Sequence, residues 1–292
     1  QLKTRTTLIG IVFLAPAFIL MSYTNFIPTI WNFILSLQST NMRVFRWVGL
    51  ENYVNALGDR VFLNSLGNSI LIAVVSTFFA VLIGVALAIM IFEMRQVEGA
   101  FYRLVIFMPT MIPLAITGVL FIFVYNPASG MLNNFLRMVG LDDLTQAWLG
   151  RAPLSLFAIS VVNIWRIVGL PMMLVYAALQ SIPESLLEAS KLDGASYFQY
   201  LRFILLPLLK PIVRVISVFV LIINFKAFDL VLVLTNGGPG NMSRIVPIHI
   251  VETAITYNKF GEAASQGVIM TFVILIFLLV LNRVLKGENY EY

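Results

Sequence analysis

Residues 68–92 read NSILIAVVSTFFAVLIGVALAIMIF and contain no charged side chain. A helix needs about 20 consecutive, mostly apolar residues to cross the hydrocarbon core of a bilayer. This stretch is long enough and apolar enough to do so. It therefore predicts a membrane-spanning helix and places the chain among integral membrane proteins.

Comparable apolar stretches recur along the whole chain. The prolines that fall within or near them are compatible with membrane helices, because neighbouring helices can re-satisfy the freed backbone groups. No internal repeat or low-complexity tract divides the sequence, so we expect one transmembrane domain over residues 1–292. The predicted fold is an all-α polytopic membrane protein with six spans: 8–30, 68–92, 101–125, 154–179, 208–235 and 264–286.

The composition supports a chain dissolved in lipid. Apolar residues make up 60% of the sequence and charged residues only 11%, which is more apolar surface than a soluble domain can bury. The net charge of +5 does not indicate nucleic-acid binding, because the 19 basic residues are scattered rather than clustered. The chain has no cysteine and a single histidine, His249, so disulfides and thiolate sites are excluded and no metal site is expected.

The N-terminal segment resembles a secretory signal, with Lys3 and Arg5 preceding an apolar run. The apolar residues continue to Leu37, longer than a signal core, so we expect an uncleaved first span. Lysine and arginine are more numerous on the side that holds both termini, which favours cytoplasmic termini. The loop after the fourth span is then cytoplasmic.

That loop carries the signals of a short, well-defined helix over about residues 183–193. Ser181 can cap the helix, and Pro183 suits its first turn. Asp193 and Gly194 end it, since glycine accepts the left-handed conformation at little steric cost. Two interpretations remain open at this level: an ordinary interfacial connector between spans, or a rigid element that transmits movement.

A stretch that begins within this helix and continues beyond it, EASKLDGASYFQYLRFILLPLLKP (Glu188–Pro211), resembles the signature loop of bacterial ABC importer permeases. Ser190 stands where that family usually has alanine, a residue of similar size. The positions that match the family pattern are Glu188, Ala189, Gly194, Ile204, Leu206 and Pro207.

Four further segments are similar to the carbohydrate branch of these permeases, the type found in maltose, multiple-sugar and glycerol phosphate importers. The similarity extends over residues 8–286. The segments are WVGLENYVNAL (Trp47–Leu57), RLVIFMPTMIP (Arg103–Pro113), NIWRIVGLPMMLVYAALQSIPE (Asn163–Glu184) and LTNGGPGN (Leu234–Asn241).

The resemblance implies a non-catalytic permease subunit in the bacterial inner membrane. It implies a second permease, two ATPase subunits that bind ATP and Mg²⁺, and a solute-binding protein outside. This chain has no GxxxxGK[ST] loop, so we expect it to bind no nucleotide or other cofactor itself. By resemblance, the residues that couple it to the ATPases are Glu184, Glu188, Ala189, Asp193 and Gly194.

Polar residues within the spans are candidates for the substrate path, because ionisable groups at membrane depth need a partner or a polar cavity. Amides suit sugar hydroxyls, and aromatic faces suit the apolar faces of sugar rings. Alternatively, Lys226 and Asp229 neutralise each other, and Arg166 anchors the second permease. The candidates are Asn163, Trp165, Arg166, Asn224, Phe225, Lys226, Phe228 and Asp229.

Other functions compete with the carbohydrate importer. The Gly237–Gly240 turn fits either contact with a binding protein or simple loop closure. An ABC permease for a non-sugar solute is the first alternative, and an ion-coupled secondary transporter is the second. The latter class usually carries several intramembrane carboxylates, whereas here only Asp229 lies well inside a predicted span. A passive channel would leave the cytoplasmic helix unexplained.

Overall fold

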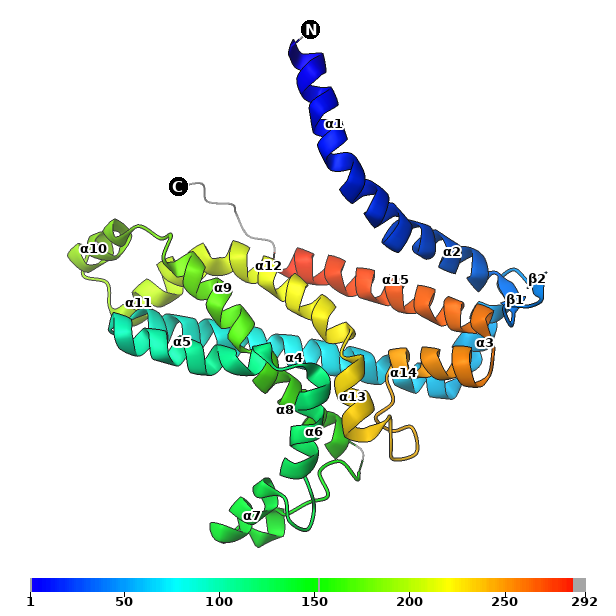
Figure 1. The fold of residues 1–292 in the computed structure, drawn as a ribbon. Coiled ribbons are helices and arrows are strands. Elements are labelled where there is room, and N and C mark those ends of the chain that lie inside the picture. Colours follow the sequence, from blue (N-terminus) through cyan, green and yellow to red (C-terminus); the bar gives the residue numbers. More distant parts are fainter. Residues whose placement is uncertain (1, 152, 286–292) are drawn as a thin grey trace. The chain divides into compact units, whose positions relative to one another are not determined.

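A computed structural model describes residues 2–151 and 153–285 (Figure 1). In the first half of the chain the elements are α1 (Leu2–Met21), α2 (Ile27–Ser36), β1 (Gln38–Thr40), β2 (Phe45–Trp47), α3 (Glu51–Gly58), α4 (Arg60–Phe92), α5 (Gln96–Met111), α6 (Leu114–Val124) and α7 (Met131–Met138). In the second half they are α8 (Leu154–Ile167), α9 (Gly169–Leu179), α10 (Glu184–Leu192), α11 (Tyr197–Tyr200), α12 (Leu206–Phe225), α13 (Phe228–Thr235), α14 (Val246–Val251) and α15 (Phe260–Val284).

Within the described part of the chain, the structure confirms an all-α polytopic membrane protein. Five helical segments are long and apolar enough to cross a membrane, or up to six if the bent α5–α6 pair is one span. The five segments are 11–36, 60–92, 154–179, 197–225 and 260–284.

The stretch predicted as one span over 101–125 is sharply bent. Helices α5 and α6 meet at 98° across a break of two residues. Ile112 has an extended backbone (φ −76°, ψ 128°) and Pro113 follows it as the N-cap of α6. The cause is local, because a proline ring disfavours helical geometry in the residue before it. This apolar stretch therefore forms two helices instead of one.

The stretch predicted over 208–235 is also interrupted. Helix α12 ends at Phe225, with Lys226 (φ −97°, ψ 14°) as its C-cap, and α13 begins at Phe228. Asp229 therefore lies in the first turn of a new helix, where the positive end of the helix dipole favours a carboxylate.

Two compact units can be distinguished within the predicted domain of residues 1–292. One comprises the segment up to Leu63 together with His249–Thr271, and the other comprises Asn64–Ile248 with the segment from Phe272 onward. The first unit contains the antiparallel β1–β2 hairpin, in which Ser39 lies opposite Arg46.

The second unit contains two apolar clusters of buried side chains. The first cluster includes Ala80, Ile167 and Val220, and it is built from α4, α8, α9 and α12. The second includes Ile72 and Leu230 and draws on α4, α8 and α13. Helices α4 and α8 contribute to both clusters. Their residues between these contributions therefore lie between the two apolar clusters, and some of them are polar.

Candidate functional site

The loop after the fourth predicted span folds as predicted into a short helix ended by glycine. Gly194 has φ +74°, and the chain turns there: Asp193 N–H donates to Ala189 O (3.0 Å) and Ala195 N–H donates to Ser190 O (3.0 Å). These two bonds satisfy carbonyls that the helix end would otherwise leave open. The turn fixes the direction in which the chain leaves α10.

The predicted coupling residues lie on an accessible surface. Glu188, Ala189, Asp193 and Gly194 are exposed, and Leu192 beside them is 89% exposed. The backbone of Glu184 begins α10, but its side chain lies outside the described part of the structure. An exposed leucine next to two carboxylates is a surface that a protein partner could cover.

Ser181 does not act as predicted. Its hydroxyl donates to Ala178 O (2.7 Å), a carbonyl at the end of α9. Serine side chains readily form such local bonds to nearby backbone carbonyls. Ser181 therefore contributes to ending α9 rather than to starting α10.

A second helix, α11, follows the glycine turn, and its capping box was not predicted from the sequence. Ser196 accepts from Gln199 N–H (3.4 Å), and Gln199 Oε1 accepts from Ser196 N–H (2.7 Å), which is a capping box. The Tyr197 hydroxyl donates to the Glu93 carboxylate just after α4. The Ser-x-x-Gln spacing could have revealed the cap, and together these bonds tie the end of the loop to the transmembrane helices.

Three buried polar side chains from separate helices form a chain of hydrogen bonds in the second unit. Asn163 Nδ2 donates to Asn224 Oδ1 (2.9 Å), and Asn224 Nδ2 donates to Thr77 Oγ1 (2.9 Å). Asn163 is fully buried and its Oδ1 has no partner among the described residues. The structure thus brings together the two predicted path amides, and Thr77, which sequence reasoning missed, joins them.

The remaining path candidates differ in their surroundings. Arg166 is buried, and its Nε has no partner in the described part of the chain. Trp165 is 40% exposed, with its ring 5.2 Å from that of Phe121. Phe225 is buried and Phe228 is half-buried in the second apolar cluster. Their side chains thus range from buried to 40% exposed.

Lys226 and Asp229 do not neutralise each other, which was the alternative to their substrate-path role. Both residues are exposed, and no ion pair joins them within the described ranges. The break between α12 and α13 explains this, because the two residues are not on one continuous helix.

The glycine-rich loop after α13 is held by hydrogen bonds within it and to α4. Gly237 and Gly240 have positive φ values of 81° and 55°, and the Ser243 hydroxyl donates to Gly238 O (2.6 Å). Asn68 Nδ2 on α4 also donates to the carbonyls of Met242 and Arg244 (2.9 Å each). The loop therefore has a defined shape fixed to α4.

Comparison with known proteins identifies related sequences. The family described as "Binding-protein-dependent transport system inner membrane component" matches residues 80–287. The chain is 33% identical to YurN of Bacillus subtilis, named as a probable ABC transporter permease protein, over 97% of this chain and 98% of that one. It is 30% identical to the trehalose/maltose transport system permease protein MalF of Thermococcus litoralis (97% and 93%) and 32% identical to the diacetylchitobiose uptake system permease protein NgcF of Streptomyces coelicolor (85% and 74%).

The fold also matches solved structures. A chain of a bacterial ABC transporter involved in the import of the acidic polysaccharide alginate aligns with a TM-score of 0.84 at 22% identity, covering 97% of this chain and 96% of that one. A chain of the MetNI methionine ABC transporter aligns with a TM-score of 0.55 at 19% identity, covering 77% and 94%.

Proposed function

Because the chain belongs to the family of binding-protein-dependent transport system inner membrane components, and is thus a multi-pass ABC permease, we propose that it imports a carbohydrate. One observation carries the mechanism: an exposed helix, α10, stands between two spans and is fixed at its end by Gly194. The carbohydrate assignment is supported by relatives named for trehalose/maltose, diacetylchitobiose and sulfoquinovosyl glycerol.

In this proposal the chain is a mechanical part of the pump and catalyses no reaction. Two separate ATPase subunits bind ATP and Mg²⁺, and one of them docks on α10 through Glu184, Glu188, Ala189, Asp193 and Gly194. A second permease completes the translocation path, and a solute-binding protein delivers the sugar from outside. Both termini are cytoplasmic, which places α10 on the side where ATP is available.

The rigidity of the loop supports this role. The glycine turn, the capping box of α11 and the hydrogen bond from Tyr197 to Glu93 leave few freely rotating links between α10 and the spans. When the ATPases close, a displacement of α10 would then move α4 and α12 instead of being absorbed by a slack loop. The alternative interpretation, an ordinary interfacial connector between spans, requires none of these bonds.

Asn163 and Asn224 are the central residues of the proposed substrate path. These two residues are hydrogen-bonded to each other between the two apolar clusters. We assign to them contact with sugar hydroxyls in a conformation in which this bond is open, with Trp165, Arg166, Phe225, Lys226, Phe228 and Asp229 along the same path. Asn163 Oδ1 has no partner among the described residues, which supports this assignment because buried polar atoms are rarely left without a partner.

Uptake into proteoliposomes tests the function. The chain is co-purified with its second permease and ATPases, and the solute held by its binding protein is identified by mass spectrometry. We expect uptake of that solute, a carbohydrate, only with ATP on the ATPase side. In the same assay, Asn224→Ala should raise the half-saturating sugar concentration. Uptake driven by a proton or sodium gradient without ATP, or a non-carbohydrate solute, would contradict the proposal.

A further inference from the structure

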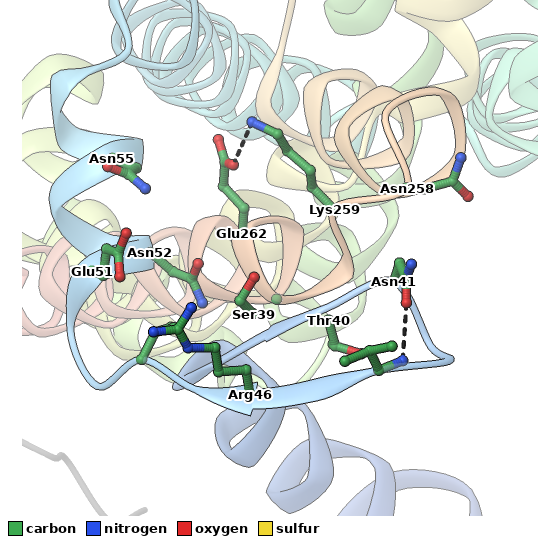
Figure 2. Close-up of a pocket in the computed structure, with 13 residues that line it drawn as sticks. Ser39, Thr40, Asn41, Arg46, Glu51, Asn52, Asn55, Asn258, Lys259 and Glu262 are labelled. Atoms are coloured by element: carbon green, nitrogen blue, oxygen red, sulfur yellow. Dashed lines mark hydrogen bonds and ion pairs between the residues drawn. The ribbon is translucent and has the colours of Figure 1, made fainter.

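We propose that a polar cleft in the first unit, outside the membrane, is a binding site for an uncharged stretch of the imported carbohydrate. The cleft lies between the β1–β2 hairpin, α3 and the start of α15, and its volume is about 570 Å³ (Figure 2). Ligand pockets commonly span roughly 300–1,000 Å³. None of the proposed coupling or path residues lines this cleft.

The floor of the cleft is held rigidly. Asn52 Nδ2 donates to the carbonyls of Ser36 and Gln38 (2.9 Å each), which fixes α3 to the hairpin. The Ser265 hydroxyl donates to Asn52 O (3.2 Å), which fixes α15 to α3. Gly261 packs so tightly on Gln38 O that a Cβ would lie 1.7 Å from it. Three chain segments are therefore locked together beneath the opening.

The walls, in contrast, present polar groups that are not used by the protein. Ser39 and Arg46 rise from opposite positions on the hairpin, and Glu51 and Asn55 follow one side of α3 (Figure 2). Among the described residues, the side chains of Arg46, Glu51 and Asn55 form no hydrogen bond or ion pair. A fixed floor beneath unpaired donors and acceptors is pre-organised for a ligand that supplies both kinds of group.

The chemistry of the lining points to an uncharged polyhydroxy ligand. The basic groups of the cleft, Arg46 and Lys259, are matched by the acidic Glu51 and Glu262, and Lys259 already pairs with Glu262 (3.0 Å). A charge-balanced cleft gives no net attraction to an anion or a cation. Amides, hydroxyls, a carboxylate and a guanidinium instead match sugar hydroxyls, which donate and accept. Among the described residues, no aromatic side chain lines the cleft, so binding depends on hydrogen bonds.

This inference rests on the proposed function, since it takes the cargo to be a carbohydrate. It adds a place where sugar leaving the binding protein is held before it enters the transmembrane path. Holding sugar there raises its local concentration at the entrance. The cleft should therefore affect the sugar concentration needed for uptake more than the maximal rate.

Saturation-transfer NMR on the intact complex in nanodiscs, without binding protein, tests the cleft. The probes are maltose, trehalose and diacetylchitobiose. We expect saturation of at least one of them, and a loss of about fivefold in Arg46→Gln and in Asn55→Ala, because each removes a hydrogen bond. Ser39→Tyr, which fills the cleft from an exposed strand position, should abolish it. The matched control is Arg60→Gln, an exposed arginine of the same unit that does not line the cleft.

The outcomes separate this inference from the proposed function. If the wild-type complex drives ATP-dependent sugar uptake but none of the three probes receives saturation, the cleft is not a sugar site. The same conclusion follows if Ser39→Tyr, or both polar variants should it not fold, bind like the wild type. Failure of ATP-dependent uptake in the wild-type complex would instead reject the proposed function.

Discussion

At the scale of single residues, Gly194 matters for its backbone alone. Its φ of +74° lies in the left-handed region, and a Cβ built there would meet nothing within 4 Å. A substitution would therefore cause no clash. It would only oppose the backbone conformation, which costs an L-residue roughly 1–2 kcal/mol. The residue thus offers a clean way to perturb the angle of α10.

We expect Gly194→Val to uncouple the complex. A β-branched side chain disfavours positive φ and should tilt α10, so that stimulation of ATP hydrolysis by substrate and binding protein falls several-fold while the subunits still co-purify. Gly140→Val is the control, because Gly140 has φ +78°, equally open surroundings and a place just after α7, which the proposed orientation puts on the opposite side of the membrane from α10. Full stimulation in Gly194→Val, or equal loss in both variants, would count against the assignment of α10.

The conformation of Gly194 was predictable from the sequence, whereas the hydrogen bonds between the buried amides were not. Gly194 could be assigned its conformation from the sequence, because Asp-Gly after a helical pattern is a local signal. The Asn163–Asn224–Thr77 chain could not, since its bonds join residues 61 and 147 positions apart. A single sequence marks such amides as costly in a membrane, yet it does not reveal which one each will meet.

At the scale of elements, close helix contacts depend on glycines that lie within apolar runs. Gly169, the first residue of α9, faces α5, and a Cβ there would lie 2.6 Å from Ile106 O and 2.7 Å from Phe107 Cα. Thr110 on α5 also donates to Arg166 O (2.8 Å) at the junction of α8 and α9. Small residues allow the backbones of membrane helices to approach in this way.

Gly169→Ala should therefore separate α5 from α9 at a cost of about 1–3 kcal/mol, because the obstructing atoms belong to the backbone. The measurement is the midpoint of thermal unfolding in detergent. Gly67→Ala on α4 is the matched control, since nothing lies within 4 Å of its Cβ position. There, alanine should stabilise the helix by roughly 0.5–1 kcal/mol. A Gly169→Ala midpoint at or above that of the wild type would contradict the packing described.

Elements were predictable where length and composition decide them. The apolar stretches recur as helices because exposing them to water is unfavourable, and because a helix in lipid satisfies its own backbone hydrogen bonds. Breaks within them were less predictable. The bend before Pro113 had a local signal that outweighed the continuous apolar run. The end of α12 had none, because no proline or glycine lies between Asn224 and Asp229.

At the scale of the whole molecule, each proposed site can meet its partner only if it lies on the partner's side of the membrane. Because the sequence contains no cysteine, the orientation can be tested with single introduced cysteines, and no other thiol of this chain reacts. Ser185 on α10 and Ser129 in the loop before α7 are both exposed. In intact cells, a membrane-impermeant maleimide should label Ser129→Cys. It should reach Ser185→Cys only after permeabilisation, and the reverse pattern would place α10 away from ATP.

The same variants test whether α10 meets an ATPase. In permeabilised membranes, co-expression of the ATPase subunits should reduce labelling of Ser185→Cys about fivefold or more, because a docked subunit excludes the reagent from the helix. Glu98→Cys, on the exposed first turn of α5, serves as the cytoplasmic control and should label equally with and without ATPases. Unchanged labelling of Ser185→Cys in an assembled complex that hydrolyses ATP would mean that force enters the membrane elsewhere. The hydrogen bond that ties Tyr197 of α11 to Glu93 after α4 would then serve stability alone.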